Sequence, residues 1–249
     1  MSLANKNLIS LAADRKKRQQ EKQNEVLSFL RQHLWSSQNI LQEVMHLESR
    51  QAAHKTLSQL QGEGLVRSHQ HLALGGKLTL WGITPHGQAM SFDPKTEEPC
   101  SAYFEPSRIS EQNIRHQLDI QKLRVDAEVF GWHSWTDGDR LGGLVKEAKR
   151  PDAIAKNAQG LNIAIECERT FKTIKRYEQI LVSYLKLLRA GQIEKVVWVS
   201  PTQDMADRLH KMFTGIKYVK VAGQKVLIDP IKHHVNLHFC SYENWPNFL

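Results

Sequence analysis

The spacing of apolar residues in the first third of the chain predicts three short amphipathic helices. Apolar positions recur every three or four residues in three successive stretches, 26–34, 40–47 and 53–60, which is the period of a helix that buries one face. Serines stand directly before the second and third stretches, where they can cap a helix, and glycines follow the third. The pattern therefore indicates a group of helices between residues 23 and 62.

Two strand-like stretches follow, at residues 65–74 and 77–83, and they flank Gly75 and Gly76. Glycine accepts the positive φ that tight hairpin turns require, so a Gly-Gly pair between two such stretches is a strong hairpin signal. Three short helices followed by a hairpin is the element order of a winged helix-turn-helix. We therefore predict a winged-helix DNA-binding domain over residues 23–90.

In a winged helix the third helix enters the major groove and the hairpin lies against the adjacent backbone. Arginine and glutamine can contact base edges, and lysine can neutralise phosphate. The outward residues that we expect to contact DNA, on the third helix and on the wing, are Arg50, Gln51, His54, Lys55, Ser58, Arg67 and Lys77. Winged helices also mediate protein contacts, and outward polar residues can be merely solvated, so that alternative stays open.

The pattern changes after residue 90. Three prolines and the lack of periodicity over residues 91–108 indicate a linker. A helix is expected over 109–130, and strand and helix patterns alternate from there to the end. The expected strands are 132–135, 151–156, 161–167, 195–200, 217–221, 225–228 and 235–239, and the expected helices are 171–190 and 201–213. This order predicts an α/β (α+β) domain with a mixed sheet over residues 109–249.

Length and composition agree with this division. The 249 residues suffice for a module of about 80–100 residues joined to a core of about 150. The sequence has no run of 18 apolar residues, so no membrane span is expected. The N-terminus lacks the apolar region of a secretory signal, so secretion is not expected either. The cysteines Cys100, Cys167 and Cys240 lie far apart in the sequence, which favours reduced thiols in a cytosol.

The charge balance gives the first functional indication. The net charge is +8, and an excess of that size favours a polyanionic partner, although a basic enzyme with no such partner is the simpler alternative. Residues 1–22 form a basic N-terminal arm with the run RKKR at 15–18. This arm could contact phosphates, or it could be a solvated helix face.

Three carboxylates in the second half of the chain suggest a catalytic centre. Glu166 and Glu168 lie two apart on an expected strand, so they face the same side, and Ile163 and Ile165 face the other. Asp152 begins the preceding strand. If the two strands pair through the turn at 157–160, Asp152 falls opposite residue 165 or 166. The three acidic side chains then converge near one strand end.

Clustered carboxylates repel one another, and a bound cation can compensate them. Oxygen ligands select hard ions such as Mg²⁺ or Mn²⁺, which assist phosphodiester cleavage. Lys172 and Lys175, expected in the first turns of the next helix, could stabilise developing negative charge. Salt bridges from Arg169 and Lys172 could also neutralise both glutamates without a metal, so spacing alone leaves catalysis open.

The segment RPDA at 150–153, then IAIECE at 163–168 and a lysine-bearing helix, resembles the PD-(D/E)xK restriction-endonuclease-like superfamily over about residues 110–240. The resemblance implies that Asp152, Glu166 and Glu168 bind the metal ion and take part in catalysis. Glu168 stands where a lysine is usual in that superfamily. Some members take the lysine from the following helix, and Lys175 or Lys172 fits that variant.

A winged helix joined to such a domain resembles the MobC-type relaxases (the MOBC family) of mobilizable plasmids, which are related to replication–relaxation proteins. The resemblance implies metal-dependent nicking of DNA at a plasmid origin of transfer, a bacterial cytoplasmic location, and a relaxosome accessory protein and a coupling protein as partners. The alternative hypothesis is a non-catalytic DNA-binding replication initiator or repressor, whose nuclease-like domain serves for docking.

Tyrosine relaxases use a different set of residues. They carry a histidine–hydrophobic–histidine motif and an N-terminal tyrosine nucleophile, whereas the first tyrosine of this chain is Tyr103 and its close histidine pairs do not match the motif. Tyr177 and Tyr184 lie seven apart on one face of the expected 171–190 helix. That spacing favours packing, although Tyr177 lies close enough to Lys172 in sequence to keep a nucleophilic role open.

Overall fold

The computed structural model describes residues 12–73, 76–95, 101–142 and 149–247. The chain forms two compact units, Met1–Gln121 and Lys122–Leu249, and the boundary between them falls within helix α5, Glu111–Val129. Cys100 and the first glycine of the expected Gly-Gly turn lie outside the described residues.

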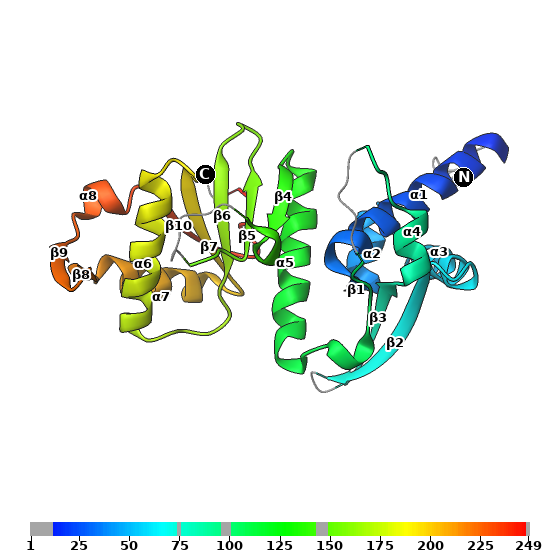
Figure 1. Ribbon diagram of the computed structural model, residues 1–249, viewed down its shortest axis with the longest axis horizontal. Helices are drawn as coiled ribbons and strands as arrows, with labels where there is room; N and C mark the ends of the chain where they lie inside the picture. Colours follow the sequence, from blue (N-terminus) through cyan, green and yellow to red (C-terminus); the bar gives the residue numbers. More distant parts are fainter. Residues whose placement is uncertain (1–11, 74–75, 96–100, 143–148, 248–249) are drawn as a thin grey trace, which may run out of the picture. The chain divides into compact units, whose positions relative to one another are not determined.

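The N-terminal unit places three helices before an antiparallel hairpin, in the order that the sequence predicts (Figure 1). Its elements are α1 Ala12–His33, β1 Trp35–Ser37, α2 Gln38–Val44, α3 Arg50–Gly62, β2 Val66–Ala73, β3 Gly76–Ile83, α4 Pro85–Met90 and the 3-10 turn η1 Pro106–Arg108. The strands form one sheet with the order β1-β3-β2, and β3 pairs antiparallel with both neighbours.

Two predicted caps fix where the second and third helices begin. The Ser37 side chain accepts a hydrogen bond from the amide of Ile40, and the Ser49 side chain accepts one from the amide of Ala52. Each bond satisfies an amide that the first turn of a helix leaves without a partner. The expected apolar faces of the helices face the core, with Leu30, Leu41 and Leu57 fully buried.

Two features of the N-terminal unit add to what the sequence predicted. The described part of the basic arm, from residue 12, is continuous with α1. Within it, Arg18 donates to the carbonyl of Met45 at 2.7 Å and pairs with Glu25 at 3.2 Å, so this side chain has a structural role. The short elements β1 and α4 carry too few residues for a periodic pattern, and the sequence therefore did not predict them.

The division between the units differs from the expected linker at 91–108. Phe104 and Ile114 are buried in one cluster with Trp35 and Leu80. The side chain of Gln121 also accepts a hydrogen bond from the Ser36 hydroxyl and donates one to the carbonyl of Trp35. The described residues from 101 to 121 thus belong to the N-terminal unit, because their apolar side chains complete its core.

The C-terminal unit is built on a mixed sheet of five strands with the order β10-β7-β6-β5-β4 (Figure 1). The strands β4, β5 and β6 are antiparallel in succession, and β6, β7 and β10 are parallel. Its elements are β4 His133–Asp137, the 3-10 turn η2 Gly138–Arg140, β5 Ala153–Lys156, β6 Asn162–Cys167, α6 Ile174–Arg189, β7 Lys195–Ser200, α7 Gln203–Thr214, β8 Tyr218–Val221, β9 Gln224–Leu227, α8 Pro230–His233 and β10 Leu237–Ser241. The predicted α+β class with a mixed sheet is confirmed.

Helices α6 and α7 cover one face of this sheet. Tyr177 and Tyr184 of α6 and Phe213 of α7 are fully buried against Trp198 of β7. The rings of Tyr184 and Trp198 meet edge to face at 5.3 Å, an arrangement that aromatic pairs prefer. This aromatic core holds α6 against the sheet, next to the end of β6 where the acidic residues lie.

The structure corrects the expected position of two segments. Strands β8 and β9 were expected to extend the mixed sheet, but they pair with each other in a separate two-stranded sheet. Helix α6 begins at Ile174, with Thr173 as its N-cap. Lys172 therefore precedes the helix, whereas Lys175 lies in its first turn.

The structure also bears on membrane-spanning helices and on the state of the cysteines. Among the described helices, none combines the length and the apolar character needed to cross a membrane. Cys167 and Cys240 are both buried free thiols.

Gly82 offers a test of the N-terminal packing. A Cβ atom at this position would lie 2.1 Å from Cγ of Phe104, a ring that is buried. We expect Gly82→Ala to lower the free energy of unfolding of this unit by about 1–3 kcal/mol, because the ring must move out of its site. A Cβ at Gly76 meets no atom within 4 Å, so Gly76→Ala is the matched control. Urea unfolding followed by tryptophan fluorescence measures both, and equal midpoints would contradict the packing.

Candidate active site

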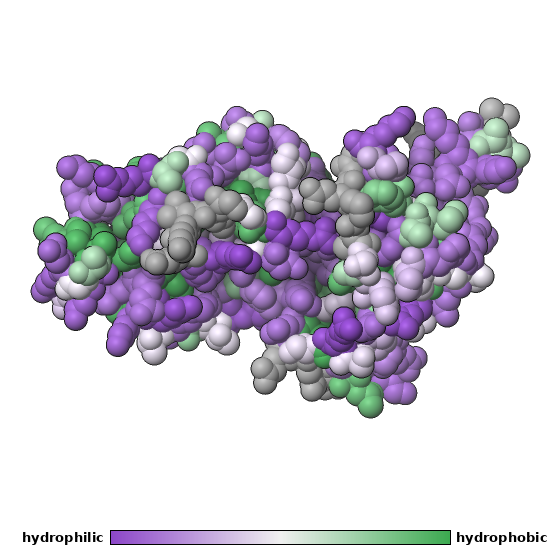
Figure 2. Space-filling model, viewed as in Figure 1, coloured by the Kyte–Doolittle hydropathy of each residue, from purple (hydrophilic) through white to green (hydrophobic). Residues whose placement is uncertain are grey.

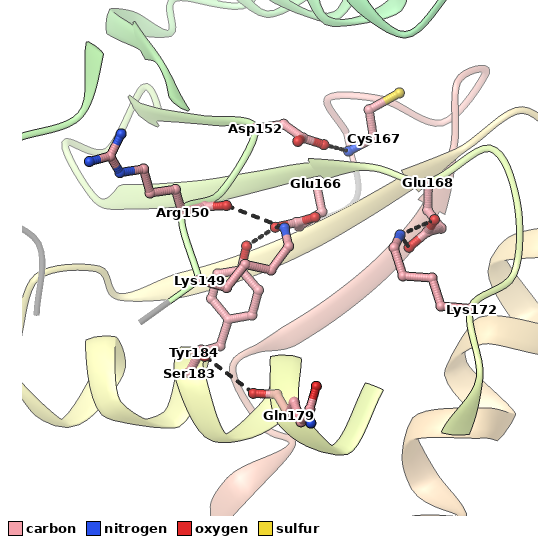
Figure 3. A network of polar contacts seen from close by, with 10 residues as sticks. All are labelled: Lys149, Arg150, Asp152, Glu166, Cys167, Glu168, Lys172, Gln179, Ser183 and Tyr184. Carbon is pink, nitrogen blue, oxygen red and sulfur yellow. Dashed lines mark hydrogen bonds and ion pairs between the residues drawn. The ribbon is translucent and has the colours of Figure 1, made fainter. Parts of the chain in front are cut away.

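The acidic residues lie where β6 ends and β5 begins. Ala153 of β5 lies opposite Ile165 of β6, and the amide of Asp152 donates to the carbonyl of Ile165 at 3.0 Å. The expected pairing of these strands is thus confirmed. The amide of Cys167 donates to Oδ2 of Asp152 at 2.8 Å, which holds this carboxylate at the sheet edge (Figure 3).

Glu166 points from β6 toward α6. Its strand neighbour on the same face, Ala164, is buried with the two tyrosines of α6, as strand alternation requires. Oε1 of Glu166 accepts hydrogen bonds from the hydroxyl of Tyr184 and from Nζ of Lys149 (Figure 3). The side chain is almost completely shielded from solvent, with 3% of the residue exposed.

The environment of Glu166 disfavours its charged form. Burial, followed by the negative charge of Asp152, raises the pKa of Glu166 from 4.5 to about 7, and Lys149 and the Tyr184 hydroxyl oppose this shift. A buried carboxylate that feels a second one is typical of functional sites, where a cation or a proton supplies the missing positive charge. Asp152 and Glu166 therefore form one electrostatic unit.

Glu168 has a different partner. Both of its carboxylate oxygens accept hydrogen bonds from Nζ of Lys172 (Figure 3). The backbone amide of Lys172 also donates to the hydroxyl of Tyr177 at 3.0 Å. The pair thus fixes the loop between β6 and α6. The salt bridge from Lys172, which the sequence offered as an alternative to a metal, is present, and Glu166 is paired with Lys149.

The three carboxylates do not form one set of ligands. In the residues that the structure describes, no three His, Cys, Asp or Glu side chains are grouped so that they could hold a metal ion. Asp152 and Glu166 nevertheless offer carboxylate oxygens, which suit a hard cation such as Mg²⁺ or Mn²⁺. The residues fit an ion held by two carboxylates, with its other positions left to water or substrate.

The lysines named from the sequence differ in their surroundings. Lys172 is engaged with Glu168, and Lys175 is exposed on the first turn of α6. Lys175 lines a hollow of about 520 Å³ whose basic side chains are Lys149, Lys175, Arg176, Lys186 and Lys220 and whose acidic side chain is Glu178. Positive charge therefore continues from the buried carboxylates along α6.

The sequence did not predict a role in the site for Lys149, and it predicted only a packing role for Tyr184. Lys149 lies three residues before Asp152, outside any periodic element, and no local pattern marks it. Tyr184 was expected to pack, and it does so while donating to Glu166. Burial raises the pKa of Tyr177 to about 12, and burial together with Glu166 raises the pKa of Tyr184. Both tyrosines thus keep their protons at neutral pH.

The expected DNA-contacting residues of the N-terminal unit lie on the solvent side of α3 and on the hairpin. All of them, Arg50, Gln51, His54, Lys55, Ser58, Arg67 and Lys77, are exposed. A hollow of about 620 Å³ lies between α3 and the hairpin, lined by His54, Ser58 and Trp81 among others. Arg67 also has a structural role, because its guanidinium donates to the carbonyl of Phe104 and lies over the Phe104 ring.

The positive face extends from α3 to α1. Burial, followed by the charges of Arg18 and Lys55, lowers the pKa of Lys22. A lysine whose charge is disfavoured by neighbouring cations marks a concentration of positive charge. Such a concentration attracts phosphates.

Fold and site together define an α+β protein with a basic helical module and a buried acidic pair at a sheet edge. The chain belongs to the replication-relaxation family, whose family model matches residues 27–199. This match runs from α1 to β7 and includes Asp152, Glu166 and Glu168. Membership points to a role in plasmid replication or mobilization and to interaction with DNA. Neither the search of curated proteins nor that of solved structures found a match.

The raised pKa of Glu166 predicts how stability depends on pH. The unfolded chain releases this proton near pH 4.5 and the folded protein only near pH 7. Folding stability should therefore fall as pH rises between these values. One pKa unit corresponds to about 1.4 kcal/mol, so the loss should be about 3 kcal/mol.

Glu166→Gln should remove this loss, so the variant gains stability relative to the wild type as pH rises through this window. Denaturant unfolding at a series of pH values measures the difference. Asp207→Asn, on the exposed face of α7, should follow the wild-type profile. Parallel profiles for Glu166→Gln and the wild type would contradict the assigned environment.

Proposed function

We propose that the protein is a metal-dependent DNA-nicking endonuclease of the relaxase type, which acts at a plasmid origin of transfer during mobilization. The observation that carries the proposal is the buried pair of Asp152 and Glu166 beside Lys149. Three antiparallel strands followed by a helix and a parallel strand surround it. This arrangement resembles the core of the PD-(D/E)xK nucleases, in which the acidic residues hold a catalytic ion.

Asp152 and Glu166 would hold a Mg²⁺ or Mn²⁺ ion in this proposal. When bound, such an ion polarises the scissile phosphodiester and lowers the pKa of the attacking group. The amide of Cys167 orients Asp152, and the hydroxyl of Tyr184 orients Glu166. Both carboxylates are thereby fixed before substrate arrives, which is what a preorganised site requires.

Lys149 is the lysine that we propose to act next to the scissile phosphate. Its ammonium group donates to Glu166 and lies 3.3 Å from the carbonyl oxygen of Arg150. On its other side it borders the basic hollow along α6. It can therefore stabilise negative charge on the substrate, and Lys175 and Arg176 would contact neighbouring phosphates. Glu168 and Lys172 would instead hold the loop after β6 in position.

The N-terminal unit would supply recognition of the DNA site. Its three helices and hairpin resemble a winged helix, and the exposed face of α3 carries residues that can contact base edges and phosphates. Nicking at a defined origin would also require a relaxosome accessory protein and a coupling protein, which we propose as partners.

The first experiment measures nicking directly. Purified protein with supercoiled plasmid that contains the origin should produce open circles in the presence of Mg²⁺ or Mn²⁺. Asp152→Asn and Glu166→Gln should lower the rate at least a hundredfold, because each removes a charged oxygen ligand. Unchanged nicking by both variants would exclude the assigned site.

The same assay distinguishes the lysines. Lys149→Ala should lower the nicking rate by about 10²–10³-fold, the usual cost of losing one group that stabilises transition-state charge. Lys175→Ala should cost less than tenfold, because its contact is with a neighbouring phosphate. The reverse order would assign the catalytic role to Lys175.

A second candidate function follows from the two ion pairs. Glu166 and Glu168 each have a lysine partner, so the fold does not depend on a metal to balance both charges. A non-catalytic DNA-binding replication initiator or repressor would use the second unit for docking. Such a protein would shift origin DNA in a gel and never nick it, whichever divalent metal is supplied.

DNA binding by α3 has its own test. Lys55→Ala should weaken binding to origin DNA and reduce the slope of log affinity against log salt by about one, because one phosphate contact is lost. Lys211→Ala, on the exposed surface of α7, removes the same charge from the other unit and should leave the slope unchanged. Fluorescence anisotropy over a series of salt concentrations provides the slopes, and equal slopes for the wild type and Lys55→Ala would contradict this interface.

A further inference from the structure

A groove of about 570 Å³ lies between α6 and the β8–β9 hairpin, away from the acidic residues. The side of α6 that lines it carries Val182, Leu185 and Leu188. Alternate positions of the hairpin complete it: Val219 and Val226 are directly paired across the two strands and both line the groove. The sides of α6 and of the hairpin that face each other are therefore aliphatic, and His233 and Asn236 add polar groups to the lining.

The rim of the groove continues this apolar surface into solvent. Val226 is 43% exposed, and its neighbours Leu227, Ile231 and Val235 are 63% to 86% exposed. Figure 2 shows hydrophobic residues gathered where Figure 1 places β9 and α8. Contiguous exposed apolar surface of this kind marks a contact site for another molecule.

Charge on the groove has one sign. The charged side chains that line it are Lys186, Arg189 and Lys232, and no Asp or Glu belongs to the lining. Asp229 caps α8, and its carboxylate lies 4.0 Å from Lys232. Cations in the last turn of a helix complement its dipole, and Lys186 and Arg189 have this position in α6. Lys232 has it in α8, but a helix of four residues has only a small dipole.

We propose that this groove binds an acidic, amphipathic segment of a partner protein. Aliphatic side chains of the segment would fill the groove, and its carboxylates would meet the basic rim. His233 is the one ring among the residues that line the groove, so the groove lacks the series of aromatic side chains on which successive nucleic acid bases stack. A second copy of this chain, which carries a net charge of +8, would meet repulsion at this basic surface.

This proposal does not rest on the proposed nicking activity, because the experiment that tests it measures only the binding of a peptide. A random peptide library is displayed and selected on the full-length protein, and the most enriched peptide is synthesised with a fluorescent label. We expect enriched peptides to combine Asp or Glu with Leu, Ile, Val or Phe. Anisotropy then measures the affinity of the labelled peptide for the wild type and for groove variants.

Residues outside the groove and its apolar rim provide matched controls. Val226→Asp and Arg189→Glu alter the lining and should each weaken binding at least tenfold. Val129→Asp, at an exposed position of α5, and Lys225→Glu, on β9, make the same kinds of change outside the lining and should leave the affinity within twofold. Unchanged thermal unfolding midpoints exclude loss of fold in all four variants.

Several results would overturn the proposal. These are failure to enrich any peptide, enrichment of peptides without acidic residues, or equal affinity for the wild type and Val226→Asp. Binding of phosphatidylglycerol vesicles that Val226→Asp abolishes would assign the groove to a membrane surface. A dimer in sedimentation velocity that the same variant abolishes would assign it to a second copy of the chain.

Discussion

The C-terminal unit is organised around one unfavourable interaction, the burial of Glu166 next to Asp152. A carboxylate removed from water beside another carboxylate raises the free energy of the folded state unless positive charge or a proton compensates it. The hydroxyl of Tyr184 and the ammonium of Lys149 supply part of that compensation. The remaining deficit appears as a pKa of about 7 for Glu166. An arrangement that costs stability and serves no packing purpose indicates a functional constraint.

The fold was largely predictable where the sequence carries a period or a cap. Helices α2 and α3 begin at the predicted serines, because a side-chain oxygen must satisfy the first amides of each helix. The pairing of β5 with β6 also followed from the short turn between them. The strands β8 and β9 show the limit of this reasoning, since an alternating pattern identifies a strand but does not specify the sheet that it joins.

The candidate site was predictable in its acidic residues and not in their partners. The strand pattern predicted that Glu166 points to one side of β6, and the register of β5 on β6 predicted that Asp152 lies beside it. Glu168 lies one residue beyond the end of β6. The ion pair of Glu168 with Lys172 depends on the conformation of the loop after β6, and the contact of Lys149 with Glu166 joins residues 17 apart. Such contacts come from loop geometry, which has no periodic signal in the sequence. The sequence therefore predicted three metal ligands, whereas in the structure only Asp152 and Glu166 lie together.

We propose that Asp152 and Glu166 form a site for a hard divalent cation and that Glu168 does not take part. Calorimetric titration of the full-length protein with Mn²⁺ measures binding at this site. The wild type and Glu168→Gln should bind the ion with similar affinity, whereas Glu166→Gln should not bind it. Equal binding by Glu166→Gln and the wild type, or no binding by the wild type, would rule out the site.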